Sequence, residues 1–399
     1  MSISGLPAVA AAPLRVALVA GEHSGDQLGA ALIAALRERV PAVQCFGVAG
    51  PKMIAAGCEA WASSEQLGVM GLAEVLRHLP RLLRLRAGLV RHLLTARPDV
   101  FIGIDAPEFN LGLARRLKAA GIRTVQYVSP QVWAWRQGRV RKIGAACDLV
   151  LCLFPFETDF YTRHQVAAQF VGHPLADQIP IGVDRAGARR ALGIDPGATL
   201  IALLPGSRMG EVGYLAGPFA TAAARLSAQR PRWQFIAPMA SAAARERFVR
   251  EVSQVPAVPE IRLVDGEAHA VLAACDAALV ASGTATLETL LSGRPMVVAY
   301  RANPVTAFVI QSLGLVKVRY FSQPNLLAGR RLVPEFLQGE VDGGRLADAL
   351  LHELEDPEHV RELLQEFATV HRALRCGGAG RAADAILALC AGARSAGSL

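Results

Sequence analysis

The chain has 399 residues, of which 52% are hydrophobic and 37 are glycine, and its formal net charge at pH 7 is +8. This length suits two domains better than one hydrophobic core, and the absence of repeats of about 20–50 residues argues against a solenoid. The positive charge leaves nucleic acid, a membrane surface and phosphorylated substrates open as partners.

Residues 1–14 are predicted to be a flexible N-terminus. They carry no basic region before an apolar stretch, so we expect no signal peptide. No uncharged apolar run reaches the about 18–20 residues that crossing a bilayer requires. The seven cysteines show no CxxC pair and no metal-like spacing with histidine, which predicts reduced thiols and no metal site.

Short apolar runs alternate with helix-length segments, a pattern typical of βαβ units and parallel sheets. The runs lie at residues 16–20, 43–48, 100–104, 124–128, 148–153 and 167–172 and, in a second series, at 199–207, 233–239, 261–266, 276–283 and 295–300. We predict an α/β protein of two Rossmann-like domains facing a cleft, over residues 15–175 and 199–365. Residues 176–198, rich in Pro and Gly, form the predicted linker, and residues 366–399 a helical tail.

A glycine-rich turn from a strand to a helix, called a corner from here on, follows the first predicted strand and has the sequence AGEHSGDQLGA. It contains Ser24 and Asp26 but matches neither GxGxxG nor a Walker A motif. Because ligands of such sheets bind at the carboxyl ends of strands, this corner is a candidate site. A tight turn that needs glycine for its backbone is the alternative.

Six arginines and no acidic residue lie between Val75 and Pro98, interleaved with leucines. The stretch contains no aromatic residue, which argues against a nucleic-acid partner. Leucine and arginine together are typical of a helix on an anionic lipid surface, although an ordinary amphipathic helix stays open. The candidate membrane patch comprises Val69, Met70, Leu72, Val75, Leu76, Arg77, Arg81 and Arg84.

The strand at 100–104 ends on Asp105, and Pro107 prevents the strand from continuing. A carboxylate at the carboxyl end of a strand is a candidate general base. Its alternative role is to cap the turn or helix that follows. Farther along, Trp133, Trp135 and Arg136 could stack on a sugar ring and attract phosphate, or belong to a packed loop.

Two corners of the second half favour an anion. In LLPGSRMGEV, the N–H groups of Gly206 and Ser207 and the guanidinium of Arg208 would meet at a helix start, an arrangement suited to a diphosphate. The corner ASGTATLE places Ser282, Gly283, Thr284 and Ala285 at a second helix start. Glu288 follows one turn later, where it could accept hydrogen bonds from ribose hydroxyls. Two ordinary helix starts are the alternative.

The segments AGEHSGDQLGA, GIDAPEFN, YVSPQVWAWR, LLPGSRMGEV, ASGTATLE and QPNLLAGR occur in this order. Together they resemble the bacterial lipid A disaccharide synthases, over residues of about 15–390. His23 and Glu108 depart from the family pattern. The resemblance implies a GT-B glycosyltransferase that joins UDP-2,3-diacylglucosamine to 2,3-diacylglucosamine 1-phosphate through a β-1,6 bond and releases UDP.

By this resemblance, Asp105 would be the base that deprotonates the acceptor 6-hydroxyl in an inverting reaction. Arg208 and the helix start at 282–285 would stabilise the leaving diphosphate in place of a metal, so no metal or other cofactor is expected. Glu288 would bind the ribose and Asn325 would lie near the diphosphate or donor sugar. Ser24 and Asp26 would contact the acceptor.

The resemblance also implies a homodimer that exchanges its helical tails, and attachment to the cytoplasmic face of the inner membrane. Acylated substrates account for the patch of leucines and arginines better than nucleic acid does. A UDP-sugar 2-epimerase of the same fold remains an alternative enzyme. A peripheral membrane scaffold is the non-enzymatic alternative.

Overall fold

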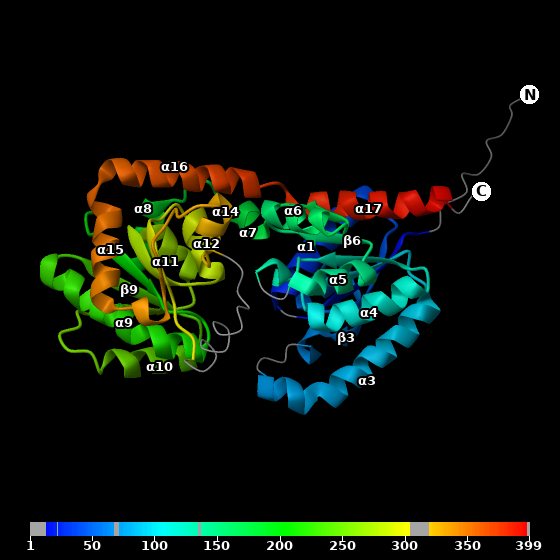
Figure 1. Ribbon diagram of the computed structural model, residues 1–399, viewed down its shortest axis with the longest axis horizontal. Helices are drawn as coiled ribbons and strands as arrows, with labels where there is room; N and C mark the ends of the chain where they lie inside the picture. The colour runs from blue at the N-terminus through cyan, green and yellow to red at the C-terminus, as the bar shows by residue number, and fades with distance from the viewer. Residues whose placement is uncertain (1–12, 22, 68–71, 135–136, 304–318, 397–399) are drawn as a thin grey trace, which may run out of the picture. The chain divides into compact units, whose positions relative to one another are not determined.

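A computed structural model describes residues 13–21, 23–67, 72–134, 137–303 and 319–396 (Figure 1). The chain forms two compact units. The first comprises residues 1–174 together with 377–399, and the second comprises residues 175–376. The prediction of two Rossmann-like domains is confirmed by the parallel sheet that each unit contains.

The sheet of the first unit has seven parallel strands in the order β3-β2-β1-β4-β5-β6-β7. The central strands β1 and β4 are almost completely buried, which their apolar sequences RVALVA and VFIGI predict. The strands are β1 (Arg15–Ala20), β2 (Gln44–Ala49), β3 (Glu59–Ser63), β4 (Val100–Ile104), β5 (Arg123–Tyr127), β6 (Leu149–Cys152) and β7 (Ala168–Phe170).

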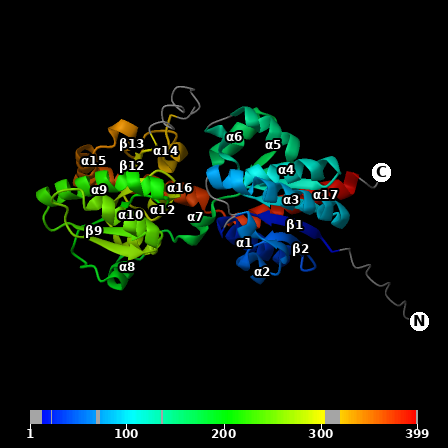
Figure 2. The same cartoon turned by 90° about the horizontal axis from the view of Figure 1, so that it is seen from below.

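Helices cover both faces of this sheet, with α1 and α17 on one face and α3, α4 and α5 on the other (Figure 2). The core between sheet and helices includes Phe101, Leu113 and Tyr161. The helices are α1 (His23–Arg39), α2 (Pro51–Ala55), α3 (Leu72–Ala96), α4 (Pro107–Ala119), α5 (Val140–Ala146), α6 (Pro155–Arg163) and α17 (Gly378–Ala396).

The second unit has six parallel strands in the order β10-β9-β8-β11-β12-β13. They are β8 (Leu200–Leu204), β9 (Gln234–Met239), β10 (Ile261–Asp265), β11 (Ala277–Ala281), β12 (Met296–Tyr300) and β13 (Glu335–Leu337). The helices are α7 (Pro174–Gln178), α8 (Arg185–Leu192), α9 (Met209–Gln229), α10 (Ala242–Val252), α11 (Ala268–Ala274), α12 (Thr284–Leu291), α14 (Gln323–Ala328), α15 (Gly343–Glu355) and α16 (Pro357–Leu374). Helices α9 and α15 lie side by side (Figure 1) and pack Phe219 and Leu350 into the core.

Two edge strands, β3 and β13, were not predicted from the sequence. The residues of β3 are half-buried or exposed, so its sequence EAWAS shows no apolar run. Strand β13 has only three residues. Helix α17 packs against α1 of the same chain, where Arg39 and Asp384 form an ion pair. Exchange of the tail between subunits stays a prediction.

Among the residues that the structure describes, no helix is long and apolar enough to span a membrane.

The order of the strands reverses between β1 and β4 in the first sheet and between β8 and β11 in the second. In open parallel sheets such switch points, at the carboxyl ends of the strands, are where ligands bind. The predicted site residues Asp105 and Arg208 follow β4 and β8, at one switch point each.

Candidate functional site

The corner after β1 and the corner after β4 meet at the switch point of the first sheet. Ala20 and Ile104 are paired in the sheet, so the segments that follow them start side by side. A Cβ atom on Gly21 would lie 2.7 Å from the Cβ of Ala106. Glycine at position 21 therefore allows the two corners to approach each other closely.

Asp105 has an unusual backbone. Both Asp105 and Ala106 are in the left-handed region, with φ of 51° and 41°. Helix α4 begins after Ala106, and no side chain caps it, so the alternative that Asp105 caps this helix is not supported. The Asp105 side chain is half-buried, and burial raises the pKa of its carboxyl, against a smaller opposing effect of the Ala106 N–H. A strained residue with a perturbed carboxyl at a switch point is a candidate for catalysis.

The neighbouring corner uses its two polar residues differently. The carboxylate of Asp26 is buried and accepts hydrogen bonds from the main-chain N–H groups of Gly50, Lys52 and Met53, at 3.0, 2.9 and 2.9 Å. These bonds hold the start of α2 and give Asp26 a structural role, and its predicted contact with the acceptor stays a prediction. Ser24 is exposed and stays a candidate for that contact.

Trp133 lies in the loop after β5, and Glu157 holds it. The Trp133 Nε1–H donates to one carboxylate oxygen of Glu157 at 3.1 Å, and the other oxygen accepts from the N–H groups of Leu153 and Phe154. The Trp133 ring also packs edge-on against Phe156. Trp133 is half-buried, so part of it is accessible. Trp135 and Arg136 lie outside the described residues.

The raised pKa of the buried Glu157 carboxyl should make the stability of the protein depend on pH. Burial raises its pKa to about 7, and its hydrogen bonds only partly oppose this shift. Between the usual glutamate pKa of 4.5 and about pH 7, the folded protein keeps a proton that the unfolded chain has released, so stability falls as pH rises. We expect the free energy of unfolding of Glu157→Gln to fall less steeply over this interval, measured by urea unfolding at several pH values. Parallel curves for the two proteins would contradict the assignment.

The PGSR corner lies at the carboxyl end of β8. Gly206 has φ of 110°, and a Cβ there would lie 2.5 Å from a carboxylate oxygen of Glu211, so glycine is required. Ser207 and Arg208 are exposed at the start of α9. The Arg208 guanidinium contacts the Glu211 carboxylate at 3.2 Å, while 78% of its side chain stays accessible. The Arg208 main-chain N–H also donates to the Glu211 carboxylate, at 3.4 Å. The corner can therefore present an exposed guanidinium at a helix start to an anion.

The start of α12 lies at the neighbouring carboxyl end, because Val280 of β11 pairs with Leu204 of β8. Gly283 and Thr284 are exposed there, and no side chain caps the helix, whereas Ser282 donates to the carbonyl of Phe321 at 3.0 Å. Ala285 is half-buried in the first turn. The structure thus brings both predicted anion corners to the switch point of one sheet.

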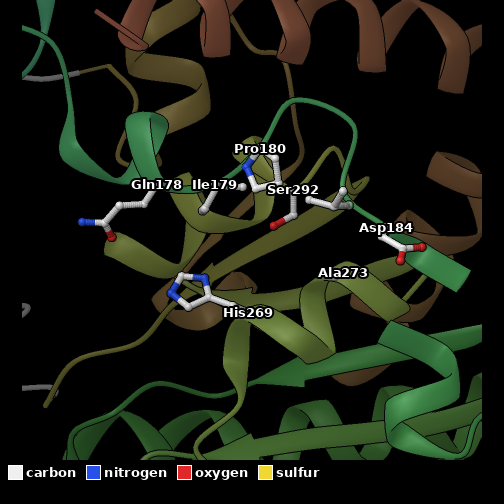
Figure 3. Close-up of a pocket in the computed structure, with 8 residues that line it drawn as sticks. Gln178, Ile179, Pro180, Asp184, His269, Ala273 and Ser292 are labelled. Carbon is white, nitrogen blue, oxygen red and sulfur yellow. The ribbon is translucent and has the colours of Figure 1, made fainter. Parts of the chain in front are cut away.

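Glu288 lies one turn into α12. Its carboxylate is 3.9 Å from the His269 ring, and burial raises its pKa against the opposing effect of His269. His269 also lines a pocket of about 320 Å³ that lies between the segment after α7 and helices α11 and α12 (Figure 3). None of the residues predicted from the sequence lines this pocket, whose other members include Gln178, Ile179 and Ala273.

Asn325 has a structural role in this arrangement. Its side chain is completely buried, its oxygen accepts from the N–H groups of Leu332 and Val333, and its nitrogen donates to the carbonyl of Val333. These bonds tie α14 to the segment before β13. That Asn325 lies near the diphosphate or the donor sugar stays a prediction. Both polar atoms of its amide already bond to the main chain, which does not favour direct contact of the amide with the sugar.

The candidate membrane patch is only partly described. Val69 and Met70 lie outside the described residues, and so do the side chains of Leu72, Val75, Leu76, Arg77 and Arg81, although the backbone of these five forms the start of α3. Arg84 is exposed. Farther along α3, Leu83 and Leu94 are 45% and 37% exposed, whereas Leu93 is buried.

Four residues of these sites were not singled out from the sequence: Asn110, Gln126, Glu157 and Glu211. The amides of Asn110 and Gln126 donate to the Asp105 carbonyl. Glu157 accepts from Trp133, and Glu211 accepts from Arg208. Each is polar and follows a predicted strand or lies within one. This position is the only feature of the sequence that could have pointed to these four residues. Among the described residues no cluster of His, Cys, Asp and Glu is arranged to hold a metal.

Comparison with known proteins identifies a family. The family model described as lipid-A-disaccharide synthetase matches residues 16–386. A lipid-A-disaccharide synthase of Pseudomonas paraeruginosa is 53% identical over 94% of this chain and 98% of its own length. The enzyme of that name from Alkalilimnicola ehrlichii is 52% identical over 95% of this chain and 99% of its own.

Among solved structures, UDP-GlcNAc 2-epimerase of Neisseria meningitidis, bound to UDP-GlcNAc, aligns with a TM-score of 0.63 and 12% identity, covering 94% of this chain and 99% of that one. The kitacinnamycin glycosyltransferase aligns with 0.61 and 21% identity over the same shares. The calicheamicin glycosyltransferase CalG4 aligns with 0.55 and 16% identity over 95% and 98%. These identities show the fold alone, which is the predicted GT-B architecture.

Proposed function

Because the chain belongs to the lipid-A-disaccharide synthase family, a family of glycosyltransferases in lipid A biosynthesis, we propose a specific reaction for it. A 2,3-diacylglucosamine unit passes from UDP to 2,3-diacylglucosamine 1-phosphate, which forms a β-1,6 bond and releases UDP. The observation that carries this proposal is the family match over residues 16–386. The paired corners at both switch points support it.

The proposed mechanism inverts the anomeric carbon. Asp105 accepts the proton of the acceptor 6-hydroxyl as its oxygen forms a bond to the anomeric carbon, and the bond from that carbon to the diphosphate breaks on the opposite face. The raised pKa of Asp105 favours this proton transfer, since a base works best when its pKa approaches the working pH. Arg208 and the start of α12 stabilise the negative charge that develops on UDP.

The reaction is tested by incubating the protein with the UDP-linked lipid, with and without the acceptor phosphate. We expect UDP and a disaccharide only when both lipids are present. Consumption of the UDP-sugar without the acceptor would favour a 2-epimerase, and no UDP release with both lipids would favour a scaffold. An excess of EDTA in the same assay tests the proposal that no metal is required, since metal dependence would abolish UDP release.

Glu288 is proposed to bind the ribose of UDP. Replacing it with alanine removes a charged hydrogen-bond acceptor, which is worth about 1.5–3 kcal/mol. We therefore expect UDP to bind about 10- to 100-fold more weakly to Glu288→Ala, measured by calorimetry. Wild type and variant should bind 2′,3′-dideoxy-UDP alike, and the exposed Glu246→Ala on α10 should bind UDP normally. An equal loss of affinity for both nucleotides would contradict the contact with the ribose.

We also propose that α3 rests on the cytoplasmic face of the inner membrane. Exposed leucines among arginines suit an anionic lipid surface. We expect Leu83→Glu to reduce cosedimentation with vesicles that contain anionic lipid, because a carboxylate would face the lipid phosphates. Ile54, which is 49% exposed on α2, supplies the control Ile54→Glu. Equal loss of binding in both variants would place the contact elsewhere.

We propose in addition that the protein is a homodimer. Light scattering tests this by measuring the molar mass in solution.

A further inference from the structure

The main chain of Asp105 is held by two buried amide side chains. The Asn110 Nδ2 donates to the Asp105 carbonyl at 2.8 Å, and the Gln126 Nε2 donates to the same carbonyl at 3.0 Å. Both residues are almost fully buried, at 0% and 1% exposure. Asn110 comes from the first turn of α4 and Gln126 from β5, so two separate elements converge on one carbonyl oxygen.

The turn that these amides contact is strained. Left-handed backbone costs roughly 1–2 kcal/mol for a residue with a side chain, and Asp105 and Ala106 adopt it in succession. Val128, the residue after the neighbouring β5, is also left-handed with φ of 75°, and the Gln126 Nε2 lies 3.3 Å from its carbonyl. Such a conformation persists only where the surroundings determine it. The hydrogen bonds from Asn110 and Gln126 are part of the surroundings that stabilise this conformation.

The packing under β4 is built around Asn110. A Cβ atom on Gly103 would lie 2.7 Å from the Asn110 Cβ and 2.9 Å from its Cγ. The absence of a side chain at Gly103 therefore makes room for Asn110. From this position the Nδ2 group also lies 3.3 Å from the Val19 carbonyl of β1 and 3.4 Å from the Ile104 carbonyl of β4. Asn110 thus links both strands of the switch point to the turn.

A comparison with Asp26 shows what this arrangement achieves. The Asp26 carboxylate is held by three main-chain N–H groups, and those bonds use most of the roughly four acceptor sites of a carboxylate. Asp105 is held through its main-chain carbonyl, and its main-chain N–H donates to the Tyr127 carbonyl at 2.9 Å, while the Ala106 N–H acts on its carboxylate. The residue can therefore be fixed in place while its carboxylate keeps acceptor capacity for a substrate hydroxyl.

We propose that Asn110 and Gln126 are positioning residues, which hold the Asp105 turn in its left-handed conformation and thereby set the direction of the Asp105 carboxylate. The inference rests on the proposed function, in which Asp105 is the general base. Neither amide touches the reacting atoms. A small displacement of a reacting group lowers a rate by about 100-fold, so the effect on turnover is large although the contact is indirect.

The test uses Asn110→Leu and Gln126→Met, which keep the approximate shape of each side chain and remove its donor. We expect kcat to fall about 100-fold in each, with KM for both lipids and the affinity for UDP within about threefold of wild type. The acid limb of the pH profile of kcat should also move to lower pH. A displaced Asp105 is less buried, and burial is what raises the pKa of its carboxyl.

Thr124→Val is the matched control. Thr124 lies in β5 like Gln126, is completely buried, and donates to the Ala146 carbonyl at 2.9 Å, but at the opposite end of the strand. It loses a buried hydrogen bond and therefore reports the effect of a purely structural contact. Because the stability of the fold itself depends on pH, each rate is divided by the folded fraction at the same pH, and a loss of folded protein then leaves the acid limb in place. Circular dichroism at the assay temperature gives the folded fraction of each variant.

The milder variants Asn110→Ser and Gln126→Asn shorten the donors, and they replace the first pair if either of those fails to fold. The inference is overturned if the folded variants of either pair keep kcat within threefold of Thr124→Val, or lose activity without a shift of the acid limb. If Asp105→Asn is inactive while these variants are active, only the positioning role is wrong. If Asp105→Asn is itself active, the proposed base is wrong.

Discussion

Asp105→Asn is expected to lower kcat by about 10³- to 10⁴-fold, the upper part of the range for a positioned general base. Asparagine has nearly the same shape but cannot accept the proton of the acceptor 6-hydroxyl. Asp105 lies in the first unit, and the corners proposed for UDP lie in the second, so the affinity for UDP should not change. Release of UDP with both lipids at saturation measures the effect on turnover, and calorimetry measures the affinity.

The control for this substitution is Asp159→Asn, a change of the same kind at an exposed position on α6 of the same unit. It should retain normal turnover. The acid limb of the pH profile should disappear in Asp105→Asn, because the group that must be ionised is gone. Activity of Asp105→Asn within about tenfold of wild type, or about 1.4 kcal/mol of barrier, would exclude Asp105 as an essential base.

Arg208→Ala is expected to lower kcat by about 10²- to 10³-fold, as the loss of one donor to a developing negative charge commonly does. The Arg208 side chain is 78% accessible and is held near the start of α9 by Glu211. It can therefore meet a diphosphate without breaking a buried contact. Arg208→Lys keeps the charge but loses the planar pair of donors, so we expect it to recover only part of the rate.

Arg225→Ala serves as the control for Arg208. Arg225 lies on the same helix, is exposed, and forms an ion pair with Asp348 at 2.9 Å, far along the helix from its start. Its loss should leave kcat unchanged, since exposed ion pairs contribute about 0–1 kcal/mol to stability. Equal effects of Arg208→Ala and Arg225→Ala would show that general positive charge, and not the corner at residues 205–208, supports the reaction.

The predicted general base and anion corners occupy the places that strand patterns indicate. Asp105 follows an apolar run, and Arg208 and Gly283 follow two others, so βαβ alternation alone puts all three at carboxyl ends. Asp26 and Asn325 show the limit of this reasoning. Both were predicted near a substrate from their motifs, and the structure shows that each side chain bonds to the main chain. A motif does not distinguish a residue that binds substrate from one that holds the loop.

By itself, the sequence determined the two parallel sheets, their central strands and the residues at the strand ends. These depend on local periodicity and on the burial of consecutive apolar residues, both of which are written along the chain. Only the tertiary structure decided which strands are neighbours, and therefore that the corners after β1 and β4 meet. It alone also showed the left-handed turn at Asp105 and the convergence of Asn110 and Gln126 on its carbonyl. Those contacts join residues from different elements, and their energies depend on distances that no local pattern encodes.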